Sequence, residues 1–296
     1  MDSNKKMMTM KKKKKKRKKS SAKAEQKNVP SMPPPLKKKK SKKTKKKKSH
    51  VPVVKDLKKG TNPFLTEYKK AIAKFPQDMD QFLDPNLKGG DIRRALLFEM
   101  LPDEMPERYA WAVPDDRALK IIAHFGPVIE IACGAGYWGR MLLDRGVDWI
   151  GYDTRQFDEA WAMVKVGGPA ALKDFPSRSL MLCYPDDFEE SMESIALTCL
   201  EEYAGDIVIH IGEMIPNTIM ENPWGKTTSS DFQLELSHGF HKVIQVPLPS
   251  WPSSLDCLSV WKRSQRTKID DMELRYIPKN ERLDLVQVCS STAHLA

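Results

Sequence analysis

Cysteine is scarce in this 296-residue sequence, and none of it is spaced for a metal site. The five cysteines are scattered, with no C-x-x-C pair and no histidine at ligand spacing, so we expect no bound metal. No apolar run approaches the ~20 residues that a membrane-spanning helix needs, and no apolar stretch follows the basic N-terminus as in a secretory signal. We therefore expect a soluble, reduced, intracellular protein that is neither secreted nor membrane-bound.

Acidic residues are almost absent from the first fifth of the chain. Residues 1–60 contain 26 lysines and arginines against three acidic residues, a charge of +23. The remaining residues contain 24 basic and 36 acidic side chains, a charge of −12, which leaves the chain at +11. The basic character therefore belongs to one segment.

Lysine runs such as Lys11 to Lys19 repel one another and bring few apolar side chains, so we predict a disordered Lys-rich tail over 1–60. One interpretation is a nuclear or nucleolar address read by the import machinery. Another is an arm that binds RNA or a ribonucleoprotein through phosphates. A solvated extension without a partner, in a cytoplasmic protein, is the alternative.

An N-terminal helical extension is predicted over 61–108. Phe64, Tyr68 and Ile72 recur at every fourth position, which is typical of an amphipathic helix. A second helix is expected to start at Asp91 and to bury one apolar stripe, formed by Ile92, Leu96, Leu97 and Met100. We expect both helices to cover the domain that follows.

From residue 109 the pattern alternates between strands and helices. This order predicts a Rossmann-like, doubly wound α/β fold with a mostly parallel sheet and helices on both faces. The strand-like runs 241–249 and 255–263 are joined by only five residues, SWPSS, so they should form an antiparallel hairpin at the sheet edge. The predicted domain therefore covers 109–263. Residues 264–296 are expected to be a tail with one short helix near 282–288.

The stretch EIACGAGYWG, from Glu130 to Gly139, combines two cofactor patterns. Starting at Gly134 it matches G-x-G-x-x-G, which is typical of dinucleotide sites. Starting at Glu130 it matches a glycine loop that is preceded by an acidic residue, E-x-x-x-G-x-G. In both patterns bare backbone and helix N–H groups approach the ligand. A carboxylate beside the loop would repel a pyrophosphate and attract a cationic ligand. Asp153, which closes the next strand, would bind ribose hydroxyls in either case.

The chain resembles the class I S-adenosylmethionine-dependent methyltransferases over roughly Trp111 to Arg263. The resemblance is carried by the loop VIEIACGAG, the strand VDWIGYD and the terminal hairpin. This resemblance implies S-adenosylmethionine as the cofactor. It also implies that Glu130 lies near the methionine moiety, that Gly134 and Gly136 allow close approach, and that Asp153 binds the ribose.

Ala132 stands where the family's pattern has its first loop glycine, a small departure. We count Ala132 and Trp138 among the candidate cofactor contacts, although Trp138 is equally consistent with core packing. More narrowly, the blocks YAWAVP, EIACGAGYWGRML and LMLCYP are similar to a little-characterised subfamily found in eukaryotes and bacteria.

The end of the fourth predicted strand, Cys183-Tyr184-Pro185-Asp186-Asp187, should face the transferred methyl group. Relatives that methylate base amines carry an Asn- or Asp-Pro-Pro-aromatic motif there, which this chain lacks. The candidates for accepting a proton are Asp186, Tyr184 and, at the end of the next strand, Glu213. Asp186 has an alternative role as the cap of the following helix.

Three functions are consistent with these patterns. The first is a methyltransferase of unknown acceptor, with RNA or a ribonucleoprotein favoured by the Lys-rich tail. The second is a non-catalytic methyltransferase-like module that binds nucleic acid or a ribonucleoprotein. The third is a nicotinamide-dinucleotide-binding Rossmann protein.

Overall fold

The computed structural model describes residues 51–76, 86, 88–102, 104–186, 193–215, 227–252, 254–283 and 294. The chain divides into two units, Met1–Lys47 and Lys48–Ala296, and all described residues belong to the second. The predicted Lys-rich tail up to residue 50 and most of the helix expected near 282–288 lie outside these ranges.

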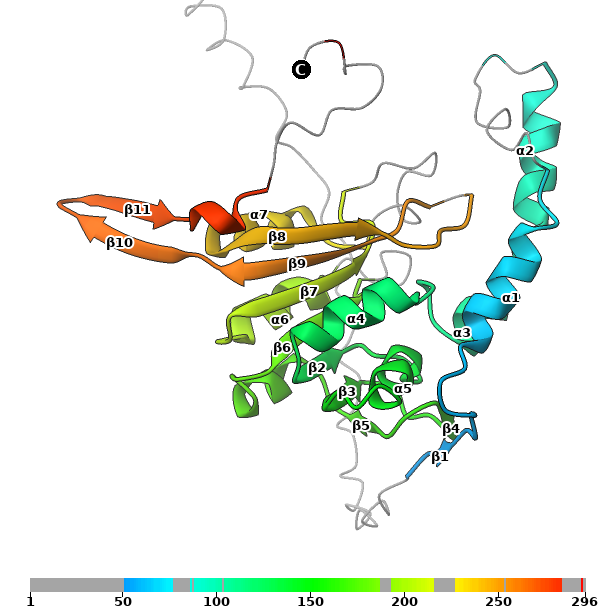
Figure 1. The fold of residues 1–296 in the computed structure, drawn as a ribbon, viewed down its shortest axis with the longest axis horizontal. Helices are drawn as coiled ribbons and strands as arrows, with labels where there is room; N and C mark the ends of the chain where they lie inside the picture. Colours follow the sequence, from blue (N-terminus) through cyan, green and yellow to red (C-terminus); the bar gives the residue numbers. More distant parts are fainter. Residues whose placement is uncertain are drawn as a thin grey trace, which may run out of the picture. The chain divides into compact units, whose positions relative to one another are not determined.

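A seven-stranded mixed sheet forms the centre of the fold (Figure 1), with the order β5-β3-β2-β6-β7-β9-β8. The five parallel strands are β2 (Val128–Ile131), β3 (Trp149–Asp153), β5 (Val164–Val166), β6 (Ser179–Cys183) and β7 (Ile207–Gly212). β9 (Cys257–Arg263) runs antiparallel to β7, and β8 (Phe240–Pro247) completes the edge hairpin. The predicted Rossmann-like α/β fold with a terminal antiparallel hairpin is confirmed.

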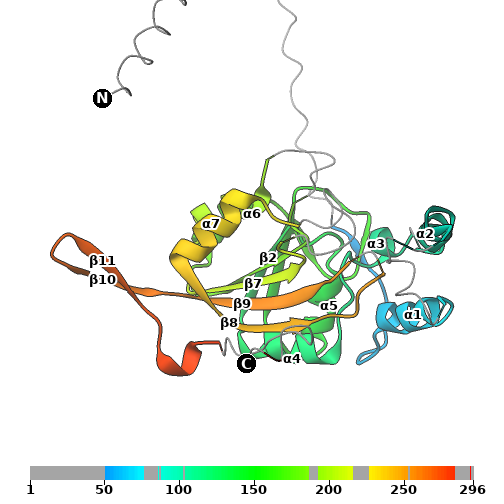
Figure 2. The ribbon, with the colours of Figure 1, turned by 90° about the horizontal axis from the view of Figure 1, so that it is seen from above.

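Helices cover both faces of this sheet (Figure 2). α4 (Asp116–His124) and α5 (Tyr137–Leu143) lie on one face, and α6 (Ile195–Glu202) and α7 (Ser230–Gly239) lie on the other. The 3₁₀ helix η2 (Pro169–Asp174) packs beside α6. Every residue of β2 and β6 is buried, as expected for central strands with helices on both sides.

The first cover helix, α1 (Pro63–Ile72), packs on the start of α5. Its Phe64 is fully buried, stacks on Tyr109 with ring centroids 5.0 Å apart, and meets Tyr137 edge-on. The hydroxyl of Tyr137 also donates to the side chain of Asn62, the residue that caps α1. Just upstream, β1 (Val53–Val54) pairs with β4 (Glu159–Ala160). The N-terminal segment is thereby attached beside the loop that precedes α5.

The buried stripe predicted for the second helix is wrong for three of its four residues, and the side chain of the fourth, Leu97, lies outside the described part of the chain. α2 (Gly90–Glu99) forms, but Ile92 is 72% exposed, Leu96 53% and Met100 40%. A helical pattern defines an apolar face without specifying what covers it, and no described element covers these side chains. The short α3 (Glu104–Arg108) then leads into the domain.

The prediction of a tail without strands beyond residue 263 is also wrong, because the structure contains a hairpin there. β10 (Gln265–Ile269) and β11 (Met272–Tyr276) are antiparallel, exposed along their whole length, and extend beyond the sheet (Figure 1). The turn places Asp270 at φ +54°. Since no apolar face of this hairpin is buried, hydropathy does not mark it. The 3₁₀ turn η3 (Lys279–Glu281) follows.

Across the described ranges, no helix combines the length and the hydropathy that crossing a bilayer requires.

Candidate functional site

The glycine loop connects β2 to α5 at the carboxyl edge of the sheet. Ala132, Gly134 and Gly136 all have left-handed backbones, with φ of 58°, 54° and 76°. A Cβ built on Gly134 would meet no heavy atom within 4 Å, whereas one on Gly136 would approach Val164 to 3.1 Å. The loop therefore packs against the sheet at Gly136. At Gly134 its backbone faces open space, which would allow a ligand to approach the backbone closely.

The backbone at Ala132 explains why the related pattern has glycine at this position. With φ at 58° a Cβ is unfavourable by roughly 1–2 kcal/mol, and glycine avoids this cost. The same loop shape is thus kept with alanine, under strain.

Asp153, at the end of β3, is connected directly to the loop. Its carboxylate accepts hydrogen bonds of 2.8 Å from the backbone N–H of Gly134 and from that of Arg155, and its side chain is buried. No helix begins after β3, so Asp153 is not a helix cap. Each carboxylate oxygen has a second lone pair, with which it could accept a hydroxyl such as those of a ribose.

Glu130 lies beneath the loop, inside the core. It is 1% exposed, and its Oε2 accepts a 2.8 Å hydrogen bond from the indole nitrogen of Trp149. In the β2–β3 register Glu130 is opposite Gly151, which has no side chain. A Cβ on Gly151 would lie 2.2 Å from the Trp149 ring, and one on Gly139 of α5 would lie 2.3 Å from it. The two glycines therefore make the slot through which Trp149 reaches Glu130.

Burial raises the pKa of Glu130 to about 8, with the Trp149 hydrogen bond acting in the opposite direction and the nearby Asp153 adding to the rise. Without a nearby cation, burial therefore favours the protonated form of this carboxyl. A cationic ligand at the loop would favour its ionised form, and a phosphate would oppose it.

Trp138 belongs to the core. It is 2% exposed, its indole nitrogen donates to the carbonyl oxygen of Ala112 at 3.2 Å, and it packs in the cluster between the sheet and α4 and α5. Of the two interpretations of this residue, the structure favours packing over ligand contact, because no part of the ring faces open space.

A second group of side chains gathers at the ends of β6 and β7. Tyr184 follows β6 with φ at +48°, its ring stacks on Trp111 at 5.9 Å and 16°, and its hydroxyl donates to Asp256. Asp256 directly precedes β9 and is 3% exposed. Because β9 is antiparallel, its first residues lie at the same edge as the last residues of β6 and β7.

Glu213 follows β7 and joins this group. It is buried, and its Oε2 accepts a weak 3.5 Å contact from the backbone N–H of Leu255. Burial raises the pKa of Asp256 to about 7; the Tyr184 hydrogen bond lowers this pKa and the charge of Glu213 raises it. The structure thus brings together two predicted candidates, Tyr184 and Glu213, with an acid that the sequence analysis missed.

Asp186 lies apart from that group. Its Oδ1 accepts from the backbone N–H of Ala196 at 3.0 Å and its Oδ2 from the hydroxyl of Ser194 at 2.7 Å, at the start of α6. Asp186 therefore accepts hydrogen bonds at the start of α6, beside the N-cap residue Ser194, a role close to the capping alternative. Asp187 lies outside the described residues.

The sequence analysis missed Trp111, Trp149 and Asp256. Asp256 is 72 residues from Tyr184, and no spacing rule connects them. One signal was available for Trp149: it lies two residues before Gly151, so both face the same side of β3.

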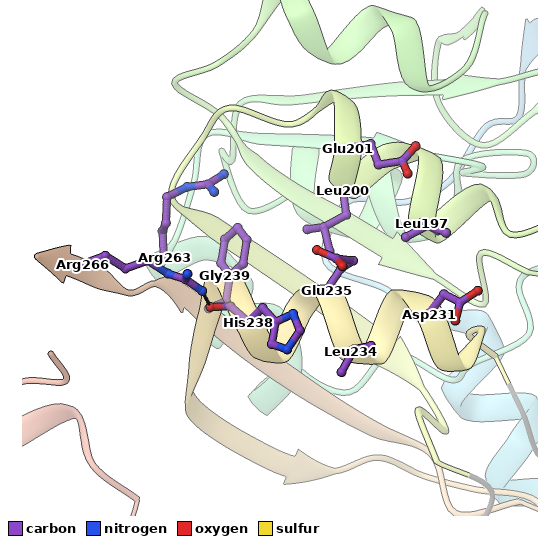
Figure 3. A pocket seen from close by; sticks show the side chains of 11 residues that line it. Leu197, Leu200, Glu201, Asp231, Leu234, Glu235, His238, Gly239, Arg263 and Arg266 are labelled. Carbon is purple, nitrogen blue, oxygen red and sulfur yellow. Dashed lines mark hydrogen bonds between the residues drawn. The ribbon is translucent and has the colours of Figure 1, made fainter. Parts of the chain in front are cut away.

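The structure also contains a groove of about 710 Å³ between α6 and α7 (Figure 3). Leu197, Leu200 and Leu234 line it, with acidic side chains beside them and Arg263 and Arg266 at one end. None of its lining residues belongs to the glycine loop or to the Tyr184 group. Within the described ranges, no three His, Cys, Asp or Glu side chains are grouped so as to hold a metal ion.

Comparison with known proteins gives fold likenesses alone. No family model matches the sequence, and no curated protein matches it. The solved structures that match in fold include several methyltransferases.

Three of these structures illustrate the likeness. The 1,6-didemethyltoxoflavin-N1-methyltransferase of Burkholderia thailandensis, with S-adenosylhomocysteine bound, is 13% identical (TM-score 0.38; 73% of this chain and 96% of that chain). The glycopeptide N-methyltransferase MtfA with S-adenosylhomocysteine is 13% identical (0.34; 50% and 88%). The methyltransferase domain of bacterial CtHen1 is also 13% identical (0.34; 49% and 97%).

Proposed function

We propose that this protein is an S-adenosylmethionine-dependent methyltransferase. One observation carries the proposal. The carboxylate of Asp153 accepts a hydrogen bond from the backbone N–H of Gly134, at the point where the glycine loop faces open space. This arrangement supplies an acceptor for ribose hydroxyls beside a surface that a ligand can approach closely.

The residues present fit this cofactor. Asp153 would hold the ribose hydroxyls, the backbone of 132–136 would lie against the ligand, and Glu130 would favour positive charge from beneath the loop. When bound, the cofactor supplies a methyl group on a sulfonium. The chain's own residues orient the acceptor, exclude water and take up a proton where the acceptor loses one.

The charge at the loop argues against a dinucleotide. Glu130 is buried beneath the loop, where a cationic ligand would favour its ionised form and a pyrophosphate would oppose it; Asp153 does not discriminate, because it would bind a ribose in either case. The antiparallel β7-β9-β8 edge, which a purely parallel dinucleotide domain does not need, supports the same choice.

For the acceptor we propose RNA or a ribonucleoprotein as the assembly that the enzyme acts on. The support is the +23 charge of residues 1–60, which would bind phosphates in a salt-dependent way. The same lysine runs support import into the nucleus or nucleolus. The acidic remainder of the chain, at −12, makes a broad nucleic-acid surface on the domain itself unfavourable.

A non-catalytic binding module is the second candidate. Two observations favour it: Asp186, the acid nearest the expected motif position, accepts hydrogen bonds at the start of α6, and the loop carries the strained Ala132. In this case the chain would bind the cofactor weakly or not at all, and would transfer no methyl group.

Incubation of a cell lysate with methyl-labelled S-adenosylmethionine tests the proposal. Wild type should label a component of the lysate, Asp153→Ala should not, and the exposed-acid control Asp206→Ala should label as wild type does. Equal labelling with wild type and Asp153→Ala would contradict it.

A further inference from the structure

We propose that Tyr184 and Asp256 form the proton-accepting pair of this site, and that the acceptor atom is an amine nitrogen that arrives as an ammonium group. This inference rests on the proposed function. It names a residue, Asp256, and a class of acceptor that the glycine loop alone does not define.

The first support is position. Tyr184 and Asp256 lie at the same sheet edge as the glycine loop, because β6 is next to β2 and β9 is next to β7. Cys183, the last residue of β6, connects the two regions: burial raises the pKa of its thiol, and the charges of Glu130 and Asp256 both add to that rise. The buried acid under the loop and the acid bonded to Tyr184 are therefore both near the end of β6.

The second support is the aromatic surface. Trp111 stacks on Tyr184 and remains 49% exposed, so one face of the stack is available to a ligand. Aromatic faces attract ammonium groups through the electrostatics of the ring. The left-handed backbone of Tyr184 is unusual for a bulky residue, and it is held by the bond from its N–H to the carbonyl oxygen of Ile211.

The third support is the charge on Asp256. Its carboxylate accepts from the hydroxyl of Tyr184 and weakly from that of Ser254, and no ion pair to it is present among the described side chains. A buried carboxyl without a cation is costly, and an ammonium ligand would offset that cost. Its pKa of about 7 also suits a base that works near neutral pH.

The chemistry follows from this arrangement. The ammonium group gives one proton to the carboxylate of Asp256, while Tyr184 holds that carboxylate in place. The freed nitrogen lone pair attacks the methyl carbon, the sulfur–carbon bond breaks, and its electron pair stays on sulfur as the thioether. The product is a methylammonium group, and the proton on Asp256 passes to water.

The same charges disfavour anionic acceptors. A carboxylate or phosphate oxygen would approach Asp256 and Glu213 against repulsion in a buried setting. Within a ribonucleoprotein, the acceptor would thus be an amine of a basic protein segment or a small polyamine, and the RNA would be the surface that the Lys-rich segment binds.

Three variants of the full chain test this inference: Asp256→Asn, Tyr184→Phe and the exposed-acid control Asp206→Asn. Circular dichroism first confirms that each is folded, and calorimetry with S-adenosylmethionine measures cofactor binding. We expect Asp256→Asn to bind the cofactor within about threefold of wild type and to lose about 100-fold or more in single-turnover methyl transfer. Tyr184→Phe should lose less, and it still tests the pair if Asp256→Asn does not fold. The rise of the wild-type rate with pH up to about 7 should disappear in Asp256→Asn.

The label itself identifies the acceptor. It should survive nuclease and mild base, and either remain with protein after protease-free gel filtration or appear in a small amine. Label released by nuclease would show an RNA acceptor, and label released by mild base would show a methyl ester; either result would overturn the inference while leaving the methyltransferase proposal intact. Full transfer by both Asp256→Asn and Tyr184→Phe would overturn it as well. An absence of cofactor binding by wild type would instead remove the proposed function.

Discussion

The indole nitrogen of Trp149 donates a 2.8 Å hydrogen bond to Oε2 of Glu130 across the bare backbone of Gly151. The acid that the glycine-loop pattern places beside a cofactor is therefore held inside the core by a neighbouring strand. Its effect on a ligand must act through the field beneath the loop, and its protonation state becomes part of the folding equilibrium.

The stability of the unliganded protein should depend on the pH through Glu130. Its pKa is about 8 in the fold, above the ordinary value of 4.5, so the native state binds the proton more tightly than the unfolded state does. This contribution is fully present below about pH 4.5 and is lost as the pH rises through 8. As the pH rises from 5 to 8, the free energy of unfolding of Glu130→Gln should therefore increase by on the order of 3 kcal/mol relative to that of wild type.

Urea unfolding of both proteins at pH 5, 6.5 and 8 measures this difference. The raised pKa of Asp256 shifts stability in the same direction, but it is common to both proteins and cancels. A constant difference between variant and wild type over this range would show that Glu130 does not titrate as described.

Gly151→Ala should unfold the protein at ordinary temperature or cost at least about 3 kcal/mol. The new Cβ would lie 2.2 Å from the Trp149 ring and 2.8 Å from the sulfur of Cys133, and neither neighbour has room to move in a packed core. Gly168→Ala is the matched control, since its Cβ would meet only Thr154 at 3.7 Å. Thermal unfolding measures the Tm of both variants. An equal decrease in the two Tm values would contradict the close packing of Trp149 against Gly151.

Ala132→Gly should stabilise the protein by roughly 0.5–1 kcal/mol. Glycine removes the strain of a backbone φ of 58° in the folded state. It also increases the conformational entropy of the unfolded chain, which offsets part of that stabilisation. Lys120→Gly, in the exposed interior of α4, should instead destabilise by roughly 0.5–1 kcal/mol. Chemical denaturation measures the change in the free energy of unfolding for each variant. The two changes should have opposite signs if the loop has the described shape, and the same sign if it does not.

Asp186→Ala should lower stability by about 1–2 kcal/mol, because the N–H of Ala196 and the hydroxyl of Ser194 lose their acceptor. Methyl transfer by the folded variant, measured well below its Tm, should remain within about threefold of wild type. A loss of transfer of 100-fold or more with unchanged Tm would instead make Asp186 the base.

The sheet could be predicted because its strands are short apolar runs separated by helical patterns, and because five residues between the last two runs leave no room for a crossover. The loop acids Glu130 and Asp153 could be predicted from their positions at strand ends. Asp256 could not, since its partnership with Tyr184 depends on β9 folding back antiparallel to β7. The burial of α2 was mispredicted because periodicity does not identify a covering surface.

Calorimetry with S-adenosylmethionine, NAD and NADP tests the central claim most directly, because it separates a cationic adenosyl ligand from phosphorylated ones. Wild type and the control Asp206→Ala should bind S-adenosylmethionine with micromolar affinity and show no heat with NAD or NADP. Asp153→Ala should lose at least about tenfold in that affinity, since its carboxylate is the acceptor for the ribose hydroxyls. Binding of NAD or NADP by wild type, or no heat with S-adenosylmethionine from a folded protein, would contradict the account.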